Sequence, residues 1–301
     1  MRNFDEVYKR IEETYGERFE KTRKFNTIFF TISFIILISF VIYVFKNLTT
    51  IDSRLLTVIF MVVCILLVSM IRIKKKSECD FKYNIINELV KEYDSGLRYN
   101  IKGEIYKKIF DDSGFEIKYT NIYSEDVIKG KLKENIDIQL GEIKLVSKEK
   151  YKDGTSESVT MFNGMFAEIL LPNNVNMPKI TIRRKVPTSY ETKRFKKIEL
   201  ESAGFNENFD FYTENPMEAL QIFTIDVVEH ILKIKEKYKK NVELILKENK
   251  ICMIFNSYKP FEIRLNKKTL DYNLLKEYYE IIEMVGNIGI YMNEIVNERS
   301  V

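Results

Sequence analysis

The chain has 301 residues, 45% of them hydrophobic and 31% charged, and a formal net charge of +4. Three of these four charges lie in the first 73 residues, because residues 74–301 carry 38 basic and 37 acidic side chains. This balance argues against nucleic acid as a partner, since dedicated nucleic-acid binders carry a large positive excess. The three cysteines form no CxxC pair and indicate a reducing compartment.

Residues 1–25 predict a cytoplasmic amphipathic helix. Its apolar side chains recur at helical spacing and would form one face: Phe4, Val7, Tyr8, Ile11, Tyr15 and Phe19. This face can lie on the inner leaflet or pack against the soluble domain. A net charge of only +1 favours packing, because helices on membrane surfaces are usually richer in lysine and arginine.

Two long apolar stretches predict a transmembrane hairpin over residues 26–73, with spans at 26–45 and 55–73. About 20 helical residues cover the ~30 Å hydrocarbon core of a bilayer. Neither stretch has the polar stripe of a soluble core helix. Arg72 interrupts the second stretch near its end, where its long side chain can extend to the headgroups.

Basic residues beside these spans predict how the hairpin is oriented. They precede the first span and end the second: Arg18, Lys21, Arg23, Lys24, Arg72, Lys74, Lys75 and Lys76. Because basic residues favour the cytoplasmic side, both termini are expected there and the loop 46–54 outside. The protein is therefore expected in the cell's inner (cytoplasmic) membrane as a two-span protein, with the lipid bilayer as its first partner.

Residues 74–301 predict a cytoplasmic α+β domain that begins with helices. Apolar spacing indicates a helix over 80–93, and Gly96 would end it as a left-handed cap. A second helix is predicted over 102–110, before a turn at 111–114.

Antiparallel β-hairpins follow these helices. Alternating apolar residues predict strands near 136–145, 159–171 and 179–186, with Asp153-Gly154 turning the first hairpin. A second hairpin pairs 242–246 with 251–255. Between the hairpins, Asn215 would cap one helix and Thr224 another over 225–240. A long C-terminal helix is predicted over 269–298, and the domain could divide into lobes at 74–200 and 201–301.

The sequence offers no catalytic signature, and we predict no catalytic, cofactor-binding or metal-binding residues and no cofactor. His230 stands alone on a predicted helix and is interpreted as a surface or boundary residue. Asn206, Asn208 and Asp210 fail as a calcium loop because Phe211 and Met217 stand where glycine and glutamate are required, so the phenylalanines there are interpreted as core or strand residues. A dispersed enzyme site could only be nominated from scattered side chains: Tyr123, Glu125, Asp126 and Asp210.

One basic cluster stands out from the neutral domain. It contains a single acid, Glu191, among eight basic residues: Lys179, Arg183, Arg184, Lys185, Lys193, Arg194, Lys196 and Lys197. Such a patch could bind anionic lipid headgroups or a partner. Equally, lysine and arginine could protect a strand edge from pairing with another chain.

Several ordered motifs of the soluble domain resemble one bacterial family, domain of unknown function 3137. They are Ser113-Gly114-Phe115, Tyr123-Ser124-Glu125-Asp126 with Gly130, Phe162-Asn163-Gly164-Met165-Phe166, and Leu200-Glu201-Ser202 leading to Phe205, Phe209 and Tyr212. The resemblance implies a membrane hairpin followed by an α+β cytoplasmic domain. It implies no catalytic residues.

The leading functional hypothesis is a non-enzymatic, membrane-anchored binding or scaffold module. It would hold an unidentified cytoplasmic protein, or a second copy of the chain, at the inner membrane. The first alternative is a regulator that senses anionic lipid through residues 179–197. The second is an enzyme with a dispersed site.

Overall fold

The computed structural model describes residues 3–46, 53–132, 135–150, 156–172, 176–184, 195–238, 241–261 and 270–298. The chain divides into two compact units. The sheet unit comprises Leu89–Glu262 and Glu277–Val301, and the helical unit comprises Arg2–Glu88 and Ile263–Lys276.

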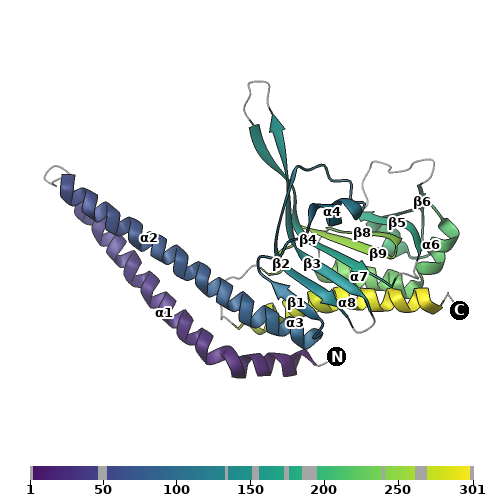
Figure 1. Cartoon of the computed structure of the whole chain (residues 1–301), viewed down its shortest axis with the longest axis horizontal. Helices are drawn as coiled ribbons and strands as arrows, with labels where there is room; N and C mark the ends of the chain where they lie inside the picture. Colours follow the sequence, from purple (N-terminus) through teal and green to yellow (C-terminus); the bar gives the residue numbers. More distant parts are fainter. Residues whose placement is uncertain are drawn as a thin grey trace. The chain divides into compact units, whose positions relative to one another are not determined.

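A nine-stranded antiparallel sheet forms the centre of the sheet unit (Figure 1). Its order is β1-β2-β3-β4-β9-β8-β5-β7-β6. The strands are β1 (Leu97–Asn100), β2 (Asn121–Lys131), β3 (Asp137–Lys150), β4 (Ser156–Leu170), β5 (Met177–Arg184), β6 (Lys196–Ile198), β7 (Phe209–Thr213), β8 (Asn241–Glu248) and β9 (Lys250–Asn256).

Helices cover the two faces of this sheet unequally. The helices α7 (Ile225–Tyr238) and α8 (Tyr272–Glu298) lie along one face, where Gly289 of α8 approaches Ile169 (Figure 1). The shorter helices α5 (Ala203–Asn208) and α6 (Pro216–Ile222) pack near β7 and β5. Within the sheet unit, α4 (Lys107–Asp112) lies on the opposite face, which we call the α4 face.

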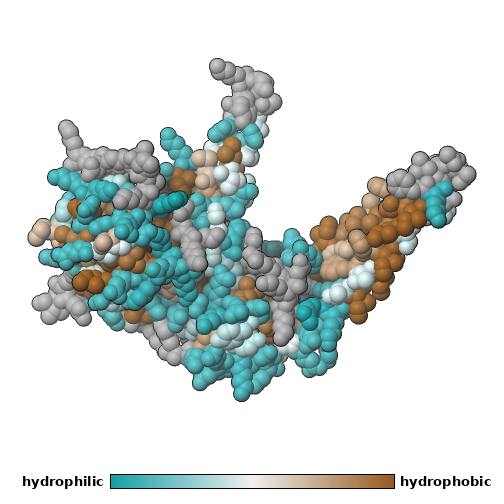
Figure 2. Space-filling model, turned by 180° about the vertical axis from the view of Figure 1, so that it is seen from behind, coloured by the Kyte–Doolittle hydropathy of each residue, from teal (hydrophilic) through white to brown (hydrophobic). Residues whose placement is uncertain are grey.

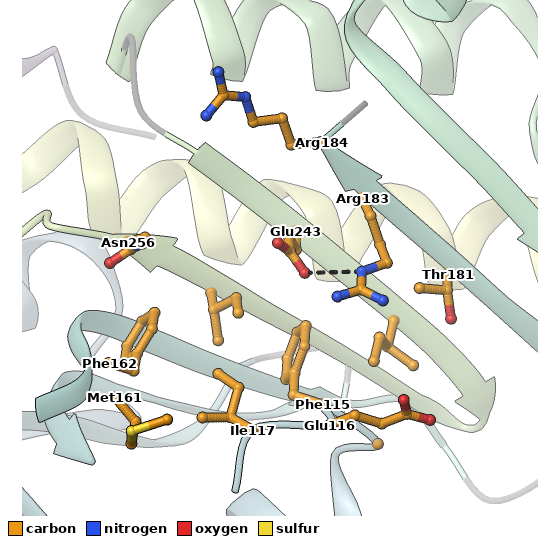
Figure 3. A pocket seen from close by; sticks show the side chains of 13 residues that line it. Phe115, Glu116, Ile117, Met161, Phe162, Thr181, Arg183, Arg184, Glu243 and Asn256 are labelled. Atoms are coloured by element: carbon orange, nitrogen blue, oxygen red, sulfur yellow. Dashed lines mark ion pairs between the residues drawn. The ribbon is translucent and has the colours of Figure 1, made fainter. Parts of the chain in front are cut away.

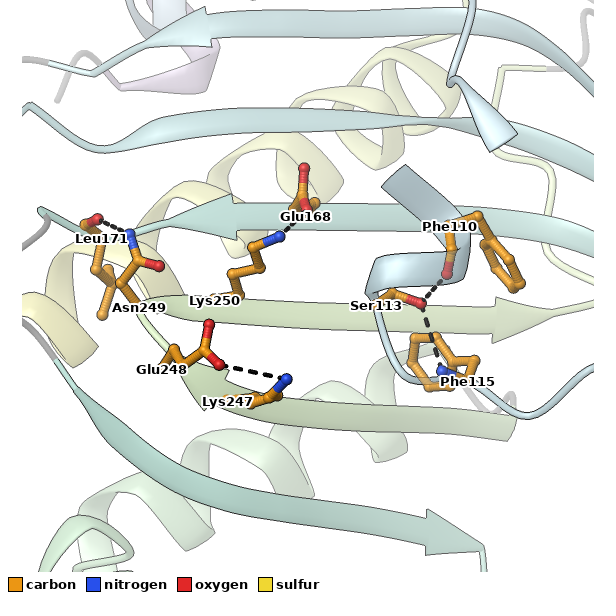
Figure 4. Close-up of polar contacts among 9 residues, drawn as sticks. All are labelled: Phe110, Ser113, Phe115, Glu168, Leu171, Lys247, Glu248, Asn249 and Lys250. Atoms are coloured by element: carbon orange, nitrogen blue, oxygen red, sulfur yellow. Dashed lines mark hydrogen bonds and ion pairs between the residues drawn. The ribbon is translucent and has the colours of Figure 1, made fainter. Parts of the chain in front are cut away.

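The α4 face holds its own apolar core. Phe110 and Phe115 pack there with Phe166, Cys252 and Ile254. The Ser113 hydroxyl donates to the Phe110 carbonyl over 2.5 Å and accepts from the Phe115 backbone N–H, which turns the chain sharply after α4 (Figure 4). Beyond this core, no described helix of the sheet unit covers the α4 face.

The helical unit consists mainly of α1 (Phe4–Lys46) and α2 (Ser53–Phe81), followed by the π-helix η1 (Lys82–Ile86), after which α3 (Asn87–Tyr93) begins. The predicted tail helix is the first part of α1, where Val7, Ile11 and Phe19 are buried. Its Tyr8 packs edge-on against Tyr272, with ring centres 5.0 Å apart. The apolar face of the tail thus packs against protein within this unit.

Apolar side chains of α1 beyond the tail point outward. Phe4–Val44 is long and apolar enough to cross a membrane, and only 6% of its most apolar stretch is buried. Among the described residues it is the one helix that meets this criterion. The apolar belt around both helices is visible in Figure 2, with Phe34 of α1 and Phe60 of α2 both more than 60% exposed.

Several local predictions are confirmed. Asn215 caps α6, because its side chain accepts from the Glu218 N–H at 3.4 Å. The hairpin of β8 and β9 forms, with Glu248 in a left-handed conformation at its turn. His230 is exposed and stacks on Tyr291. The domain is α+β with a long C-terminal helix, as predicted.

Other predictions were wrong or lie outside the described residues. Gly96 does not adopt a left-handed cap; glycine fits there because a Cβ would lie 2.0 Å from the Lys131 carbonyl oxygen. Residues 102–106 are not helical, and α4 begins only at Lys107. The sheet crosses the suggested boundary at residue 200, since β5 pairs with both β7 and β8. The Asp153-Gly154 turn and most of the loop 46–54 fall outside the described residues.

Candidate functional site

A cavity of about 280 Å³ opens on the α4 face, where β4, β9, β8 and β5 lie side by side (Figure 3). One wall is apolar and includes Phe115, Ile117, Met161, Phe162, Ile245 and Ile254. The polar part of the lining, which we call the charged wall, includes Glu116, Thr181, Arg183, Arg184 and Glu243. The cavity therefore joins an apolar surface to a charged one, as small binding sites commonly do.

An ion pair lies in the charged wall. Arg183 Nε of β5 is 3.4 Å from Glu243 Oε2 of β8, and both side chains are partly buried (Figure 3). Burial raises the pKa of Glu243, and the neighbouring Arg183 offsets part of this effect. With Arg184 and Glu116 also in the lining, the wall carries two positive and two negative charges.

The charged row continues across the next strands. The register of β5 and β7 places Arg183 opposite Asp210, whose exposed fraction is 2%. Lys197 of β6 closes the row, with its Nζ 2.6 Å from Asp210 Oδ1. This contact raises the pKa of Lys197. Opposite charges alternate here because neighbouring strands bring side chains of one face within contact distance.

Another acid, Glu168, lies on the α4 face. Glu168 of β4 is largely buried, and its carboxylate is 4.0 Å from Lys250 Nζ of β9 (Figure 4). Burial raises the pKa of Glu168, although Lys250 acts in the opposite direction. Burial likewise raises the pKa of the Cys252 thiol, which therefore stays protonated and unreactive.

The predicted basic patch is only partly a free cationic surface. Arg183 and Lys197 form the ion pairs described above, and Lys179 lies over the Phe195 ring at 5.0 Å. Arg184 and Lys196 are exposed. Lys185, Lys193 and Arg194 lie outside the described residues.

The scattered enzyme candidates do not meet in one site. Asp210 is on β7, and five strands separate it from β2, which carries Tyr123, Glu125 and Asp126. At about 4.8 Å between neighbouring strands, this separation is roughly 29 Å. Among the described residues no three His, Cys, Asp or Glu side chains gather where they could hold a metal ion.

The sequence analysis singled out Arg183 and Arg184 as members of the basic cluster, but it did not predict the other residues that line the cavity. Glu243 lies 60 residues further along the chain, and the apolar wall comes from β4 and the segment after α4. One signal was available. The alternation of Val242, Leu244 and Leu246 puts Glu243 on the opposite face of its strand, where an acid needs a cationic neighbour.

A strand edge borders the cavity. The pairing of β4 with β9 begins at Gly164, so residues 158–162 of β4 pair with β3 alone among the described strands. Met161 and Phe162 lie at this edge and also line the cavity. A strand with one unpaired edge can accept an added strand from another chain.

Comparison with known proteins gives a family without an assigned function. A family model described as "Protein of unknown function (DUF3137)" matches residues 160–293. No curated protein matches the chain. One solved structure that matches is the mycobacterial trehalose monomycolate transport factor A, TtfA, with 7% identity and a TM-score of 0.35. The match covers 66% of this chain and 93% of that one, and a score this low supports no further argument.

Proposed function

Because this chain belongs to the DUF3137 family, whose function is unknown, we propose its role from its own surfaces: it is a membrane-anchored, non-enzymatic module that binds a protein partner at the inner membrane. The cavity on the α4 face, bordered by the edge of β4, is the single observation that carries the binding role.

The anchor is the pair of helices α1 and α2, which span the bilayer at residues 26–45 and 55–73. Both carry apolar side chains on their outer surfaces, including Ile32 of α1 and Ile65 of α2. Exposing so continuous an apolar surface to water would cost free energy, whereas the hydrocarbon core of a bilayer can surround it without this cost. In this arrangement loop 46–54 is outside, while the tail 1–25 and residues 74–301 are cytoplasmic.

A polypeptide segment fits the cavity better than a polyanion. The lining is charge-balanced, and Arg183 is already paired with Glu243. A partner strand added along residues 158–162 of β4 would place alternate side chains near Met161 and Phe162. Backbone hydrogen bonds would then supply affinity, and the apolar wall would select the side chain that enters.

A regulator that binds anionic lipid through residues 179–197 is the second candidate. The exposed side chains of Arg184 and Lys196 favour it, and the ion pairs of Arg183 and Lys197 weaken it. The two candidates predict different molecules at the cavity, which makes them separable.

Photo-crosslinking in intact membranes tests the proposal. A photoreactive amino acid replaces Met161 in the full chain, and the matched control carries it at Tyr123, an exposed residue of β2 that does not line the cavity. We expect a discrete protein adduct from position 161 that position 123 does not give. Adducts with lipid alone would favour the second candidate, and identical products from both positions would refute a specific site.

Cysteine labelling tests the anchor independently. Thr50→Cys and Lys9→Cys are introduced singly after Cys64, Cys79 and Cys252 have been replaced by serine or alanine. A membrane-impermeant reagent added to whole cells should label position 50 and spare position 9 until the cells are lysed. The opposite pattern, or equal labelling, would contradict the proposed topology.

A further inference from the structure

A cleft lies between α1 and α2 where the charged tail of α1 gives way to its apolar stretch. The Asn26 side-chain amide donates to the Ser77 hydroxyl over 2.8 Å and joins the two helices there. The cleft has a volume of about 970 Å³ and is open on one side. This space is ample for a lipid headgroup and the first part of its chains.

The lining of the cleft is cationic. Arg23, Lys24 and Lys74 contribute three positive charges, and no carboxylate lines it. Lys24 contacts Glu20 at 3.1 Å and Lys74 contacts Glu78 at 3.9 Å, and the side chains of both lysines are more than 60% exposed. Such exposed pairs contribute little free energy, so a phosphate group can compete for these cations.

Hydroxyl oxygens add acceptors to these cations. Thr22, Thr27 and Thr31 each donate their hydroxyl hydrogen to a backbone carbonyl one turn earlier, at 2.9 Å. Their oxygens therefore remain available as acceptors. A headgroup that is anionic and also carries hydroxyl donors, such as a phosphoglycerol, would use both kinds of group.

The apolar part of the lining indicates a lipid rather than a free phosphate ester. Phe19, Ile28 and Phe30 line the cleft beside its charges. Ile28 and Ile32 are more than half exposed and continue the apolar surface along α1. Acyl chains leaving the cleft would meet this surface directly.

We propose that this cleft binds the headgroup of an anionic phospholipid in the cytoplasmic leaflet, with Arg23, Lys24 and Lys74 around the phosphate. The inference rests on the membrane anchoring proposed above. It assigns the lipid contact to the helical unit instead of the basic residues 179–197, and it makes the contact a defined site rather than a diffuse attraction.

Native mass spectrometry of the full chain from nanodiscs with equal phosphatidylglycerol and phosphatidylcholine tests this site. The variant Arg23→Gln/Lys24→Gln/Lys74→Gln removes the cleft charges. The control Lys21→Gln/Lys75→Gln/Lys76→Gln removes three charges at the same level of the helices that do not line the cleft. We expect the retained phosphatidylglycerol to fall by about tenfold or more in the cleft variant and to stay unchanged in the control.

Thr27→Phe fills the cleft while keeping its charges, and this variant should also lose the preference for phosphatidylglycerol over phosphatidylcholine. Equal loss in the cleft and control variants, or full retention by Thr27→Phe, would overturn the site. Carbonate extraction of the same membranes separates this outcome from failure of the anchor. A chain released by carbonate refutes the proposed anchoring, whereas a retained chain without lipid preference refutes only the cleft.

Discussion

The ammonium group of Lys259 lies 3.4 Å from Glu142 Oε2 and bridges this buried carboxylate to Glu125, which it contacts at 3.0 Å. The other oxygen of Glu142 accepts from the Phe261 backbone N–H at 2.8 Å. Burial alone would lower the pKa of Lys259, but these two carboxylates outweigh burial and raise it. The lysine therefore stays charged and compensates an acid that has no contact with solvent.

Lys259→Gln should destabilise the sheet unit by about 3 kcal/mol, because it leaves Glu142 buried without its cation. Cys252 offers a direct probe, since its side chain is 1% exposed and reacts with a thiol dye only after unfolding. Denaturant titration of the full chain, with Cys64 and Cys79 replaced by serine, would measure the change. Lys131→Gln is the control: its pair with Asp137 is exposed, so its effect should stay below about 1 kcal/mol. Equal effects would contradict this assignment.

Glu168→Gln should raise stability at alkaline pH and leave it nearly unchanged in acid. The folded state raises the pKa of Glu168, so this group favours folding most below the unfolded pKa of about 4.3. That contribution is lost as pH rises through the folded pKa, while glutamine has no such loss. Circular dichroism melts should show the midpoint of the variant a few degrees above the parent at pH 8, and the two should converge near pH 4. Glu104→Gln, at an exposed position, should give no such divergence.

Local signals in the sequence predicted local structure well. The Asn215 cap and the β8–β9 hairpin need only a few neighbouring residues, and both formed as predicted. The edge order β5-β7-β6 could not be predicted in this way, because β7 inserts between two strands that precede it in the chain. Gly96 could not be interpreted from its neighbours either. Glycine is required there because the backbone of Lys131 comes close, and not because of the turn in which Gly96 lies.

In the candidate site, too, features that depend on neighbouring residues were predictable and features that depend on strand pairing were not. Arg183 and Arg184 stood out as part of a charged run, which is a property of neighbouring residues. The structure adds that Arg183 is paired with Glu243 and lies opposite Asp210 in the strand register. Pairing across strands balances the charge of Arg183, and a single sequence does not contain that pairing.

Tyr99→Phe should cost about 1.5–3 kcal/mol, the range for a hydrogen bond to a charged group. The Tyr99 hydroxyl donates to Asp126 Oδ1, and Asp126 is fully buried in the left-handed bulge of β2. Tyr119→Phe is a matched control, because its hydroxyl donates to the exposed Asp111 at 2.6 Å and water can replace it. Denaturant titration with the Cys252 probe should separate the two variants clearly, and similar losses in both would argue against the buried bond.

Gly164→Ala should destabilise the sheet unit by about 3 kcal/mol or more, because a Cβ there would lie 2.1 Å from the Phe255 carbonyl oxygen. That oxygen belongs to the backbone of β9, so the strands must separate where their pairing begins. Gly204→Ala is the control: its Cβ would meet only Leu232 at 3.9 Å, and alanine favours the helix by up to about 1 kcal/mol. Denaturant titration should therefore move the two variants in opposite directions. An unchanged Gly164→Ala would mean that β4 and β9 do not approach this closely, and the cavity bordered by their first residue pair would then lose its structural basis.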